Sequence, residues 1–302
     1  AGYASQLQYT LRQGAIDKLT GERSPVTVEQ GRGLVRVIDN IDKRVRGEEV
    51  APLRMIVAGG PGTGKSVIID GLRDHAGRCG WDIELRFRFS APTGKAASLI
   101  GGNTLAVFAG NSQYGPKLDK LRKYWGDAWL LVIDEAFMVG LTDLGIAWAN
   151  ILKVIDDEDI DVVFVGDPLQ MGPIGDVPVY KSSFFSNHDS ELARKVFTKQ
   201  YTGDEWTSAM KVAWEFYRSF DPEANPGQGC MIWLDETKRT EGHTEWNEMM
   251  HLLRTYFRET RDGTQLDGAQ RREKVEWVAA ALDKMVVGTD DRPSAEWKRP
   301  LL

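Results

Sequence analysis

The stretch that most constrains how this chain can fold is Gly59–Gly60–Pro61–Gly62–Thr63–Gly64–Lys65–Ser66, which fits the pattern G-x-x-x-x-G-K-[ST] in full. It follows a short apolar run, Leu53–Val57, and opens a segment with helical character, Lys65–Cys79. Glycines let such a loop curl so that successive backbone N–H groups point inward, at the amino end of a helix, where phosphate oxygens bind. A glycine-rich turn is the plainer alternative, but the strand before it and the helix after it favour a phosphate-binding loop.

The remainder of the chain alternates between apolar runs and amphipathic segments. Strands are expected at Ile83–Phe89, Trp129–Ile133, Val162–Val165 and Met231–Leu234, and helices after the cap at Ser24–Gln30 and over Lys65–Cys79, Ala91–Leu99, Gly145–Ile155 and Glu205–Phe220. Short, β-branched apolar runs bounded by polar turns suit buried parallel strands. Together with the phosphate-binding loop, the pattern predicts an α/β fold of the P-loop NTPase class, a doubly wound parallel sheet with an added, mostly helical segment.

An acidic pair supplies the second half of a nucleotide site. The apolar run Leu130–Ile133 ends in Asp134 and Glu135, which in isolation could be a strand that simply meets solvent. Next to a phosphate-binding loop, Asp134 is expected to hold Mg²⁺ through water, and Glu135 to orient or deprotonate an attacking water molecule. ATP and Mg²⁺ are therefore the expected cofactors. The residues expected to bind them are Gly60, Gly62, Thr63 and Gly64 through the loop, Lys65 through its charge and Ser66 through its hydroxyl, which ligates the metal.

Three further segments carry a family resemblance. Ala91–Ala97 with Gly101–Leu105 resembles motif Ia of superfamily 1 helicases, Val165–Pro173 resembles motif III, and Leu234–Thr240 resembles motif IV. Their order and spacing, from Ser24 to Arg258, are most similar to those of the Pif-type 5′-to-3′ DNA helicases. The resemblance implies an ATP-dependent helicase core that translocates on single-stranded DNA, with roles in DNA repair, recombination or telomere maintenance. It also implies an intracellular location: nucleus or mitochondrion in a eukaryote, cytoplasm in a bacterium or for a virus.

The same resemblance implies roles for four polar residues. Gln30 corresponds to the glutamine that pairs with adenine; on the residues alone it would be an exposed glutamine at a helix start. Gln170 corresponds to the motif III residue that senses the γ-phosphate, with Asp167 supporting the magnesium end of the site. Arg239 corresponds to the arginine finger, whereas a lone arginine after a strand is more often a surface ion-pair residue. The expected catalytic set is thus Lys65, Glu135, Gln170 and Arg239.

Motif Ia provides the expected contacts to single-stranded DNA, namely Thr93, Gly94, Lys95, Gly102, Thr104 and Phe108. A strand-to-helix turn offers N–H groups, a hydroxyl and a cation to a phosphate, and Phe108 could stack on a base. Downstream, basic and aromatic residues alternate from Tyr114 to Trp125. This stretch is either a small accessory element that acts as a separation pin, as in the family, or a solvated amphipathic helix.

Composition limits the other possibilities. The chain has a net charge of −6 and a pI near 5.4, so any nucleic acid must be bound by a local basic strip rather than by bulk charge. Two cysteines and four histidines lack the spacing of a zinc site or a disulfide framework, which indicates a reducing compartment. No apolar run approaches the roughly 18 residues that would cross a bilayer, so no membrane association is expected.

We divide the chain as follows: an N-terminal extension (1–23), a RecA-like domain (24–181) with an accessory element near 110–125, a mostly helical insertion (182–230), a return to the RecA-like domain (231–290), and the start of a linker (291–302). The family's second RecA-like domain, with motifs V and VI, has no counterpart here. We therefore expect this fragment to bind ATP–Mg²⁺, to hydrolyse it slowly and not to unwind DNA alone.

Three departures from the family pattern are visible: Ala106 for a histidine, Phe137 for a small polar residue, and Met171–Gly172 for Leu-Pro. None removes a catalytic group. The alternatives to a helicase are a P-loop ATPase that acts as a switch or loader, and a truncated helicase domain that serves as an ATP-gated DNA-binding scaffold.

Overall fold

A computed structural model describes residues 26–110, 116–168, 170, 172–177, 208–222 and 224–234, together with Leu11 and two short paired strands, β1 (Ala15–Ile16) and β2 (Arg23–Ser24). The chain divides into two compact units, residues 1–236 and 237–302, and every element described below lies in the first. The motif IV residue Arg239 and the predicted linker lie outside the described residues.

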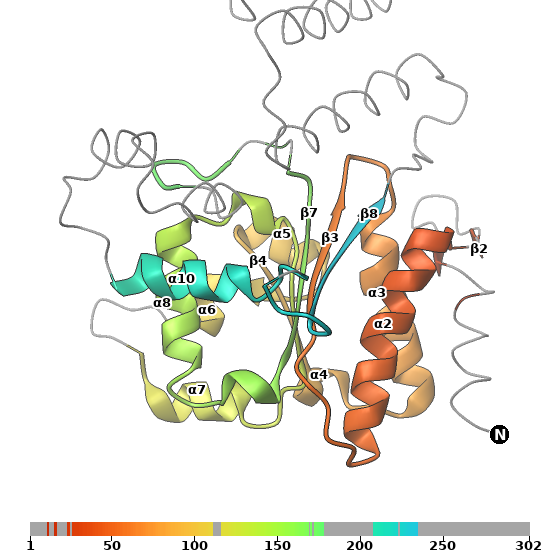
Figure 1. The fold of residues 1–302 in the computed structure, drawn as a ribbon, viewed down its shortest axis with the longest axis horizontal. Coiled ribbons are helices and arrows are strands. Elements are labelled where there is room, and N and C mark those ends of the chain that lie inside the picture. Colours follow the sequence, from red (N-terminus) through yellow and green to blue (C-terminus); the bar gives the residue numbers. More distant parts are fainter. Residues whose placement is uncertain are drawn as a thin grey trace, which may run out of the picture. The chain divides into compact units, whose positions relative to one another are not determined.

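A six-stranded parallel sheet forms the centre of this unit, in the order β5-β4-β6-β7-β3-β8 (Figure 1). The strands are β3 (Arg54–Gly59), β4 (Phe87–Ala91), β5 (Asn103–Thr104), β6 (Leu130–Ile133), β7 (Asp161–Gly166) and β8 (Gly229–Leu234). The four middle strands are buried at every residue, which matches a parallel sheet covered on both faces. The predicted doubly wound α/β fold is confirmed.

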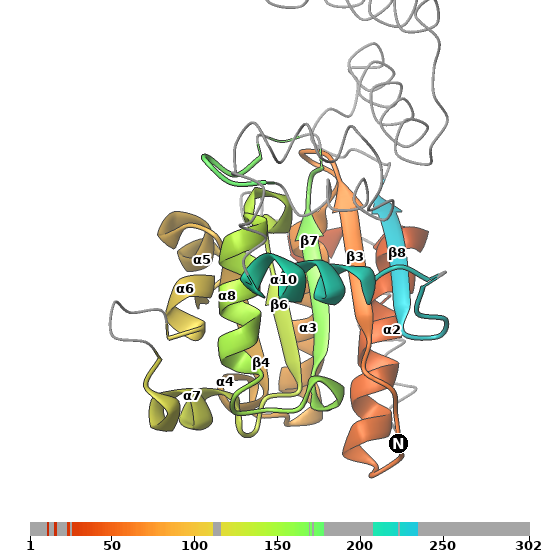
Figure 2. The same cartoon turned by 60° about the vertical axis from the view of Figure 1, so that its left-hand side comes forward.

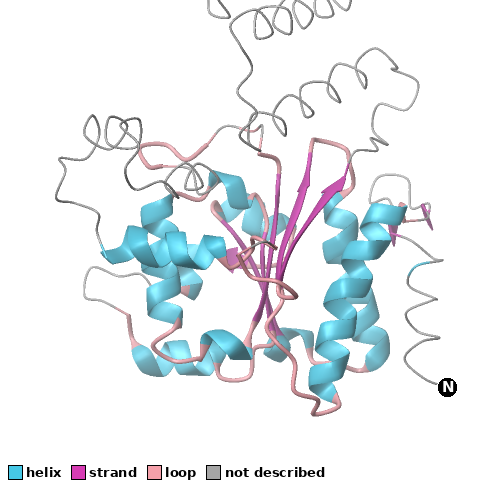
Figure 3. Cartoon of the chain, viewed as in Figure 1, coloured by secondary structure: helices cyan, strands magenta, loops and turns pink. Residues whose placement is uncertain are grey.

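Helices cover both faces of the sheet (Figure 3). On one face lie α2 (Val28–Val45) and α3 (Lys65–Cys79), and on the other α6 (Leu105–Phe108), α8 (Leu141–Ile151) and α10 (Ser208–Arg218) (Figure 1). Successive residues of a strand point to opposite faces, so Met55 and Val57 of β3 pack with α2 and α3, whereas Ile56 and Ala58 pack on the α8 side. The shorter helices are α4 (Ile83–Arg86), α5 (Gly94–Leu99), α7 (Leu118–Trp125), η1 (Ala136–Met138) and η2 (Asp157–Asp159).

Several predicted boundaries differ from those observed: the helix predicted to end at Ile155 ends at Ile151, and the helix predicted from Ala91 begins at Gly94. Two further differences have a local cause. The run Ile83–Phe89 is not one strand: α4 occupies Ile83–Arg86 and β4 begins at Phe87, because the carboxylate of Asp82 accepts a hydrogen bond from the N–H of Leu85 and caps a helical turn. The helix predicted over Gly145–Ile155 starts earlier, at Leu141, because the Asp176 carboxylate accepts the N–H of Thr142 at 2.9 Å. Both contacts are side-chain hydrogen bonds to backbone N–H groups, which hydrophobic periodicity does not register.

Helix α10, which lies within the predicted mostly helical insertion 182–230, belongs to the main core. Its Phe216 ring stacks on Trp148 of α8 with ring centroids 3.8 Å apart, and Phe220 lies 4.3 Å from Phe164 of β7. The contact is close at the backbone too, since a Cβ at Gly145 would overlap the carbonyl group of Ala209. The described helix of the predicted insertion thus packs on the RecA-like core, and residues 182–207 lie outside the described residues.

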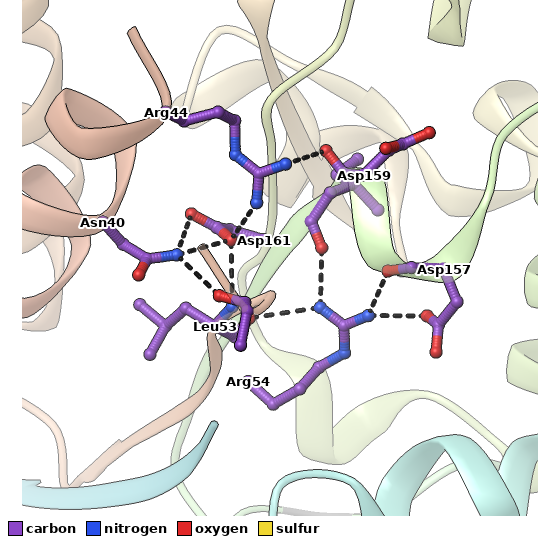
Figure 4. A network of polar contacts seen from close by, with 9 residues as sticks. Asn40, Arg44, Leu53, Arg54, Asp157, Asp159 and Asp161 are labelled. Atoms are coloured by element: carbon purple, nitrogen blue, oxygen red, sulfur yellow. Dashed lines mark hydrogen bonds and ion pairs between the residues drawn. The ribbon is translucent and has the colours of Figure 1, made fainter. Parts of the chain in front are cut away.

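At the amino end of the sheet, a polar network ties α2 to the strands (Figure 4). The buried carboxylate of Asp161 accepts hydrogen bonds from the N–H of Leu53 (2.9 Å), the Asn40 amide (2.9 Å) and the Arg44 guanidinium (3.0 Å). Beside it, the buried Arg54 guanidinium donates to the carbonyl of Ile160 at 2.6 Å. Helix α2 is thereby held at its carboxyl end by groups that are costly to leave unpaired.

Candidate nucleotide-binding site

The glycine-rich loop joins β3 to α3 at the carboxyl edge of the sheet, where the orange trace turns over at the top of Figure 1. Gly62 and Gly64 have φ of 78° and 77°, a left-handed conformation that a side chain would disfavour. The Lys65 ammonium donates to the carbonyls of Gly59 (2.9 Å) and Gly60 (3.0 Å), and the Thr63 hydroxyl donates to Gly60 (2.9 Å). The loop is thus curled around its own lysine, as the phosphate-binding interpretation requires.

The acidic pair follows β6, which pairs with β7, which in turn pairs with β3. Two strand spacings, about 10 Å, therefore separate β6 from β3, a span that side chains and a triphosphate could bridge. The N–H of Asp134 donates to the carbonyl of Ser90 at 2.7 Å, and the Asp134 carboxylate accepts the N–H of Glu135 at 3.0 Å. Both bonds fix the strand end, so the Asp134 carboxylate is held in place.

Glu135 has φ 51° and ψ 36°, and it is the one residue other than glycine with a positive φ in the described part of the chain. Such strain persists where the surrounding structure enforces it, and it is concentrated at functional sites. The segment after it crosses close to β7: a Cβ on Gly166 would lie 2.8 Å from the Phe137 ring. The departure at Phe137 thus has a packing role, since this buried ring fills the space above a glycine.

Asp134 and Glu135 both lie in surroundings that disfavour the charged form of their carboxyl groups. Burial raises the pKa of Asp134 above its ordinary value, against the hydrogen bond from Glu135 and the charge of Lys65. Burial also raises the pKa of Glu135, the charge of Asp134 adds to it, and Lys65 and a hydrogen bond from the Gln170 side chain oppose it. The Glu135 Oε2 atom is buried and has no hydrogen-bond partner within the described residues. Like charges in a desolvated site favour a bound cation or a bound water molecule.

Motif III brings Gln170 to this pair. Asp167 directly follows β7 and is buried, and its carbonyl accepts the N–H of Gln170 at 3.1 Å. Three of the four predicted catalytic residues, Lys65, Glu135 and Gln170, are therefore gathered at one edge of the sheet. The fourth, Arg239, lies outside the described residues. No group of three or more histidine, cysteine or acidic side chains is arranged to hold a metal in the described part. The roles of Ser66 and Asp134 as metal ligands stay a prediction.

Gln30 lies beside the loop, but its amide is already engaged. It is 1% exposed; its Oε1 accepts the N–H of Thr27 at 2.9 Å, and its Nε2 donates to the carbonyl of Thr63 at 3.0 Å. The alternative of an exposed glutamine at a helix start is therefore wrong. Pairing with adenine stays a prediction, and it would require the amide to leave both partners.

The motif Ia turns lie at the same edge as the loop. β4 pairs with β5 through Ser90 with Asn103 and Ala91 with Thr104, which sets the two following turns side by side. Thr93 caps α5 by accepting the N–H of Ala96 at 3.2 Å, and Thr104 caps α6 by accepting the N–H of Val107 at 3.4 Å. Thr93, Gly94 and Lys95 are exposed, so they are available to a ligand.

Two predicted DNA contacts, Phe108 and Gly102, have structural roles in the fold. Phe108 is 4% exposed, its carbonyl accepts the Trp125 indole N–H at 3.0 Å, and its ring packs edge-on against Trp125. Stacking of Phe108 on a base is therefore contradicted, because its side chain is on the buried face of the short helix α6. A Cβ on Gly102 would overlap the carbonyl of Phe89, so this glycine allows close packing of the chain on β4.

The basic stretch before β6 lies at the opposite edge of the sheet. Helix α7 buries Leu121 and Trp125 and exposes Lys120, Arg122 and Lys123. The Tyr124 carbonyl accepts hydrogen bonds from the guanidinium of Arg88, at the start of β4, and Figure 2 shows α7 at the lower edge while α5 is at the upper edge. The stretch thus matches the solvated amphipathic helix, at a distance from the motif Ia turns; residues 111–115 lie outside the described part.

Asp176 is a residue that the sequence reasoning missed. Its carboxylate accepts hydrogen bonds from the N–H (2.9 Å) and hydroxyl (3.1 Å) of Thr142, and so joins the loop after motif III to the start of α8, downstream of Glu135. The partners are 34 residues apart, and no local pattern signals the contact.

The chain matches one family model and several solved structures. The sequence profile of a family described as an AAA domain matches residues 50–213, more than half of the chain. Among solved structures, the Pif1 helicase of Candida albicans is 22% identical with a TM-score of 0.46, covering 83% of this chain and 47% of that one. A Bacteroides Pif1 in complex with ADP-AlF3 and single-stranded DNA is 18% identical with a TM-score of 0.47, covering 91% and 52%.

The chain therefore spans about half the length of these Pif1 structures. A search of curated proteins gives no match. Across the described residues, no helix combines the length and apolar character of a membrane span. Both the phosphate-binding loop (59–66) and the acidic pair (134–135) lie within the residues that the profile matches. The chain belongs to the AAA domain family of P-loop NTPases.

Proposed function

We propose that this chain is the ATPase core of a DNA helicase that uses ATP–Mg²⁺ to translocate 5′-to-3′ on single-stranded DNA. The observation that carries the proposal is the backbone of Glu135, which is held at φ 51° and ψ 36° directly after β6, at the same edge of the sheet as Lys65. Glu135 is the residue expected to orient or deprotonate the attacking water. The exposed motif Ia turn at Thr93–Lys95 lies on the same edge of the sheet, so the residues proposed for ATP and those proposed for DNA share one edge.

The residues present fit ATP–Mg²⁺. The loop has left-handed glycines and a lysine at its mouth, and the buried Oε2 of Glu135 has no partner in the described part of the chain. Ser66 and Asp134 would hold the cation, which offsets the negative charge of the phosphates. The raised pKa of Glu135 makes it a better proton acceptor than an ordinary glutamate, which suits the deprotonation of water near neutral pH.

A switch or loader ATPase shares the loop and the acidic pair, but it does not predict the paired motif Ia turns. A scaffold that binds DNA without turnover would not require the strained backbone of Glu135. Roles in repair, recombination or telomere maintenance, and a nuclear, mitochondrial or cytoplasmic location, rest on the resemblance of the motifs alone.

The test is ATP hydrolysis by the wild type and by Lys65→Ala, with and without single-stranded DNA. We expect DNA to stimulate the wild type, and the variant to lose about 100-fold or more, because the cation that stabilises the phosphoryl charge is gone. Lys120→Ala, on the exposed face of α7, is the matched control and should retain the wild-type rate. Stimulation by a protein but not by DNA would support the switch or loader, and DNA binding without turnover would support the scaffold.

A further inference from the structure

The amide of Gln30 connects the first turn of α2 to the phosphate-binding loop. Its Nε2 donates to the carbonyl of Thr63 at 3.0 Å and lies 3.5 Å from the carbonyl oxygen of Gly64, the two residues directly before Lys65. The approach is close, because a Cβ on Gly64 would overlap that Nε2 atom. The contact is also buried, since Gln30 is 1% exposed. A buried amide whose oxygen and nitrogen are both hydrogen-bonded is a strong constraint on its partners.

Holding these carbonyls has a geometric consequence for the loop. A peptide unit is planar and trans, so its C=O and the following N–H point in opposite directions. When the Thr63 oxygen points toward α2, the N–H of Gly64 points the other way, into the loop. The same relation ties the Gly64 oxygen to the N–H of Lys65. Gln30 therefore acts on the orientation of the N–H groups that face the phosphates.

The element that carries Gln30 is itself rigid. Helix α2 buries Leu34, Val37, Ile38 and Ile41, and its carboxyl end is bound to Asp161 by Asn40 and Arg44. At its amino end, Thr27 and Gln30 form a reciprocal capping box, with the Thr27 hydroxyl accepting the N–H of Gln30 at 3.2 Å. The amide is thus presented from a fixed position, which a flexible segment could not do.

We propose that Gln30 is a positioning residue that orients the loop N–H groups, and that it sets the affinity for the polyphosphate chain whatever base is attached. The proposal rests on the nucleotide-binding function proposed above. It differs from adenine recognition, because in this structure both ends of the amide are bound to backbone groups.

Two substitutions distinguish the bond from Gln30 to the loop from the capping of helix α2 by Thr27 and Gln30. In Gln30→Glu, one carboxylate oxygen still accepts the N–H of Thr27, as a glutamate does in a capping box, but the other cannot donate to the Thr63 carbonyl. In Thr27→Ala, the hydroxyl half of the cap is lost while the amide keeps its bond to Thr63. If Gln30→Glu does not fold, Gln30→Met keeps the shape of the side chain and removes the donor.

The experiment measures binding of ATP, GTP and inorganic tripolyphosphate, each with Mg²⁺, by calorimetry. We expect Gln30→Glu to weaken all three by a similar factor of about tenfold, and Thr27→Ala to change each by less than about twofold. A loss confined to ATP would overturn the proposal in favour of adenine recognition. Equal losses in the two variants would reduce Gln30 to a helix cap. A wild-type chain that binds none of the three ligands would refute the nucleotide-binding function itself, and the positioning role with it.

Discussion

Replacing Gly145 by alanine tests whether α10 is part of the core. Gly145 lies in the middle of α8, where α10 crosses it, and a Cβ there would overlap the carbonyl of Ala209 and lie 3.1 Å from its Cα. These are backbone atoms, so no side chain can rotate away. Restoring an ordinary carbon contact of about 3.5–4.0 Å requires α10 to move outward by roughly 1 Å or more.

The cost can be worked out from the contacts. Overpacking costs about 1–3 kcal/mol, and opening the stack of Phe216 on Trp148 adds about 1 kcal/mol. The better helix propensity of alanine returns about 1 kcal/mol, which leaves a net loss of roughly 1–3 kcal/mol in the free energy of unfolding. Gly77→Ala is the control, because a Cβ there meets nothing within 4 Å inside α3, and it should gain about 0.5–1 kcal/mol.

Urea unfolding followed by far-UV circular dichroism, with midpoints compared at equal slope, measures both variants. The expected order of stability is Gly77→Ala, then the wild type, then Gly145→Ala. If Gly145→Ala were as stable as Gly77→Ala, α10 would not pack on α8 as described, and residues 208–218 would belong to a separate insertion after all.

Two further substitutions probe buried polar groups. Burial, with the nearby charge of Arg78, lowers the pKa of His75 to about 4, because the folded state disfavours the protonated imidazole. The neutral side chain therefore contributes fully to the free energy of unfolding above its ordinary pKa of about 6.5. About 3 kcal/mol of that free energy is lost as the pH falls from 6.5 to about 4. His75→Gln should remove this loss, and urea titrations at pH 7, 6 and 5 that stay parallel for both proteins would refute the assignment. The Ser90 hydroxyl is buried and has no hydrogen-bond partner among the described residues, so Ser90→Ala should leave stability unchanged or raise it by about 1 kcal/mol; a clear loss of thermal stability would reveal an unseen partner.

Structural features formed by residues close in sequence were predicted correctly from the sequence. The loop before Lys65, the strand that ends at Asp134 and the helix over Lys65–Cys79 each consist of neighbouring residues whose backbone requirements are local. A left-handed glycine or a helix start needs no distant partner. For this reason the fold class and the centre of the site could be predicted.

Roles that depend on contacts with residues distant in sequence were predicted less well. Phe108 was expected at a base but lies against Trp125, and for the basic stretch that ends in α7 a separation pin and a solvated helix were both left open. Hydrophobic periodicity indicates that one face is buried, but it does not say which element covers it.

The amino-acid sequence by itself determined that a phosphate-binding loop and an acidic pair lie on a parallel α/β sheet, because these features arise from contiguous residues and their backbone chemistry. Only the tertiary structure decided that Gln30 is bound to the loop 33 residues away, that Asp176 is bound to Thr142, and that α10 packs on the core. Those contacts form between segments that only folding brings together, and their geometry depends on the packing of every element between them.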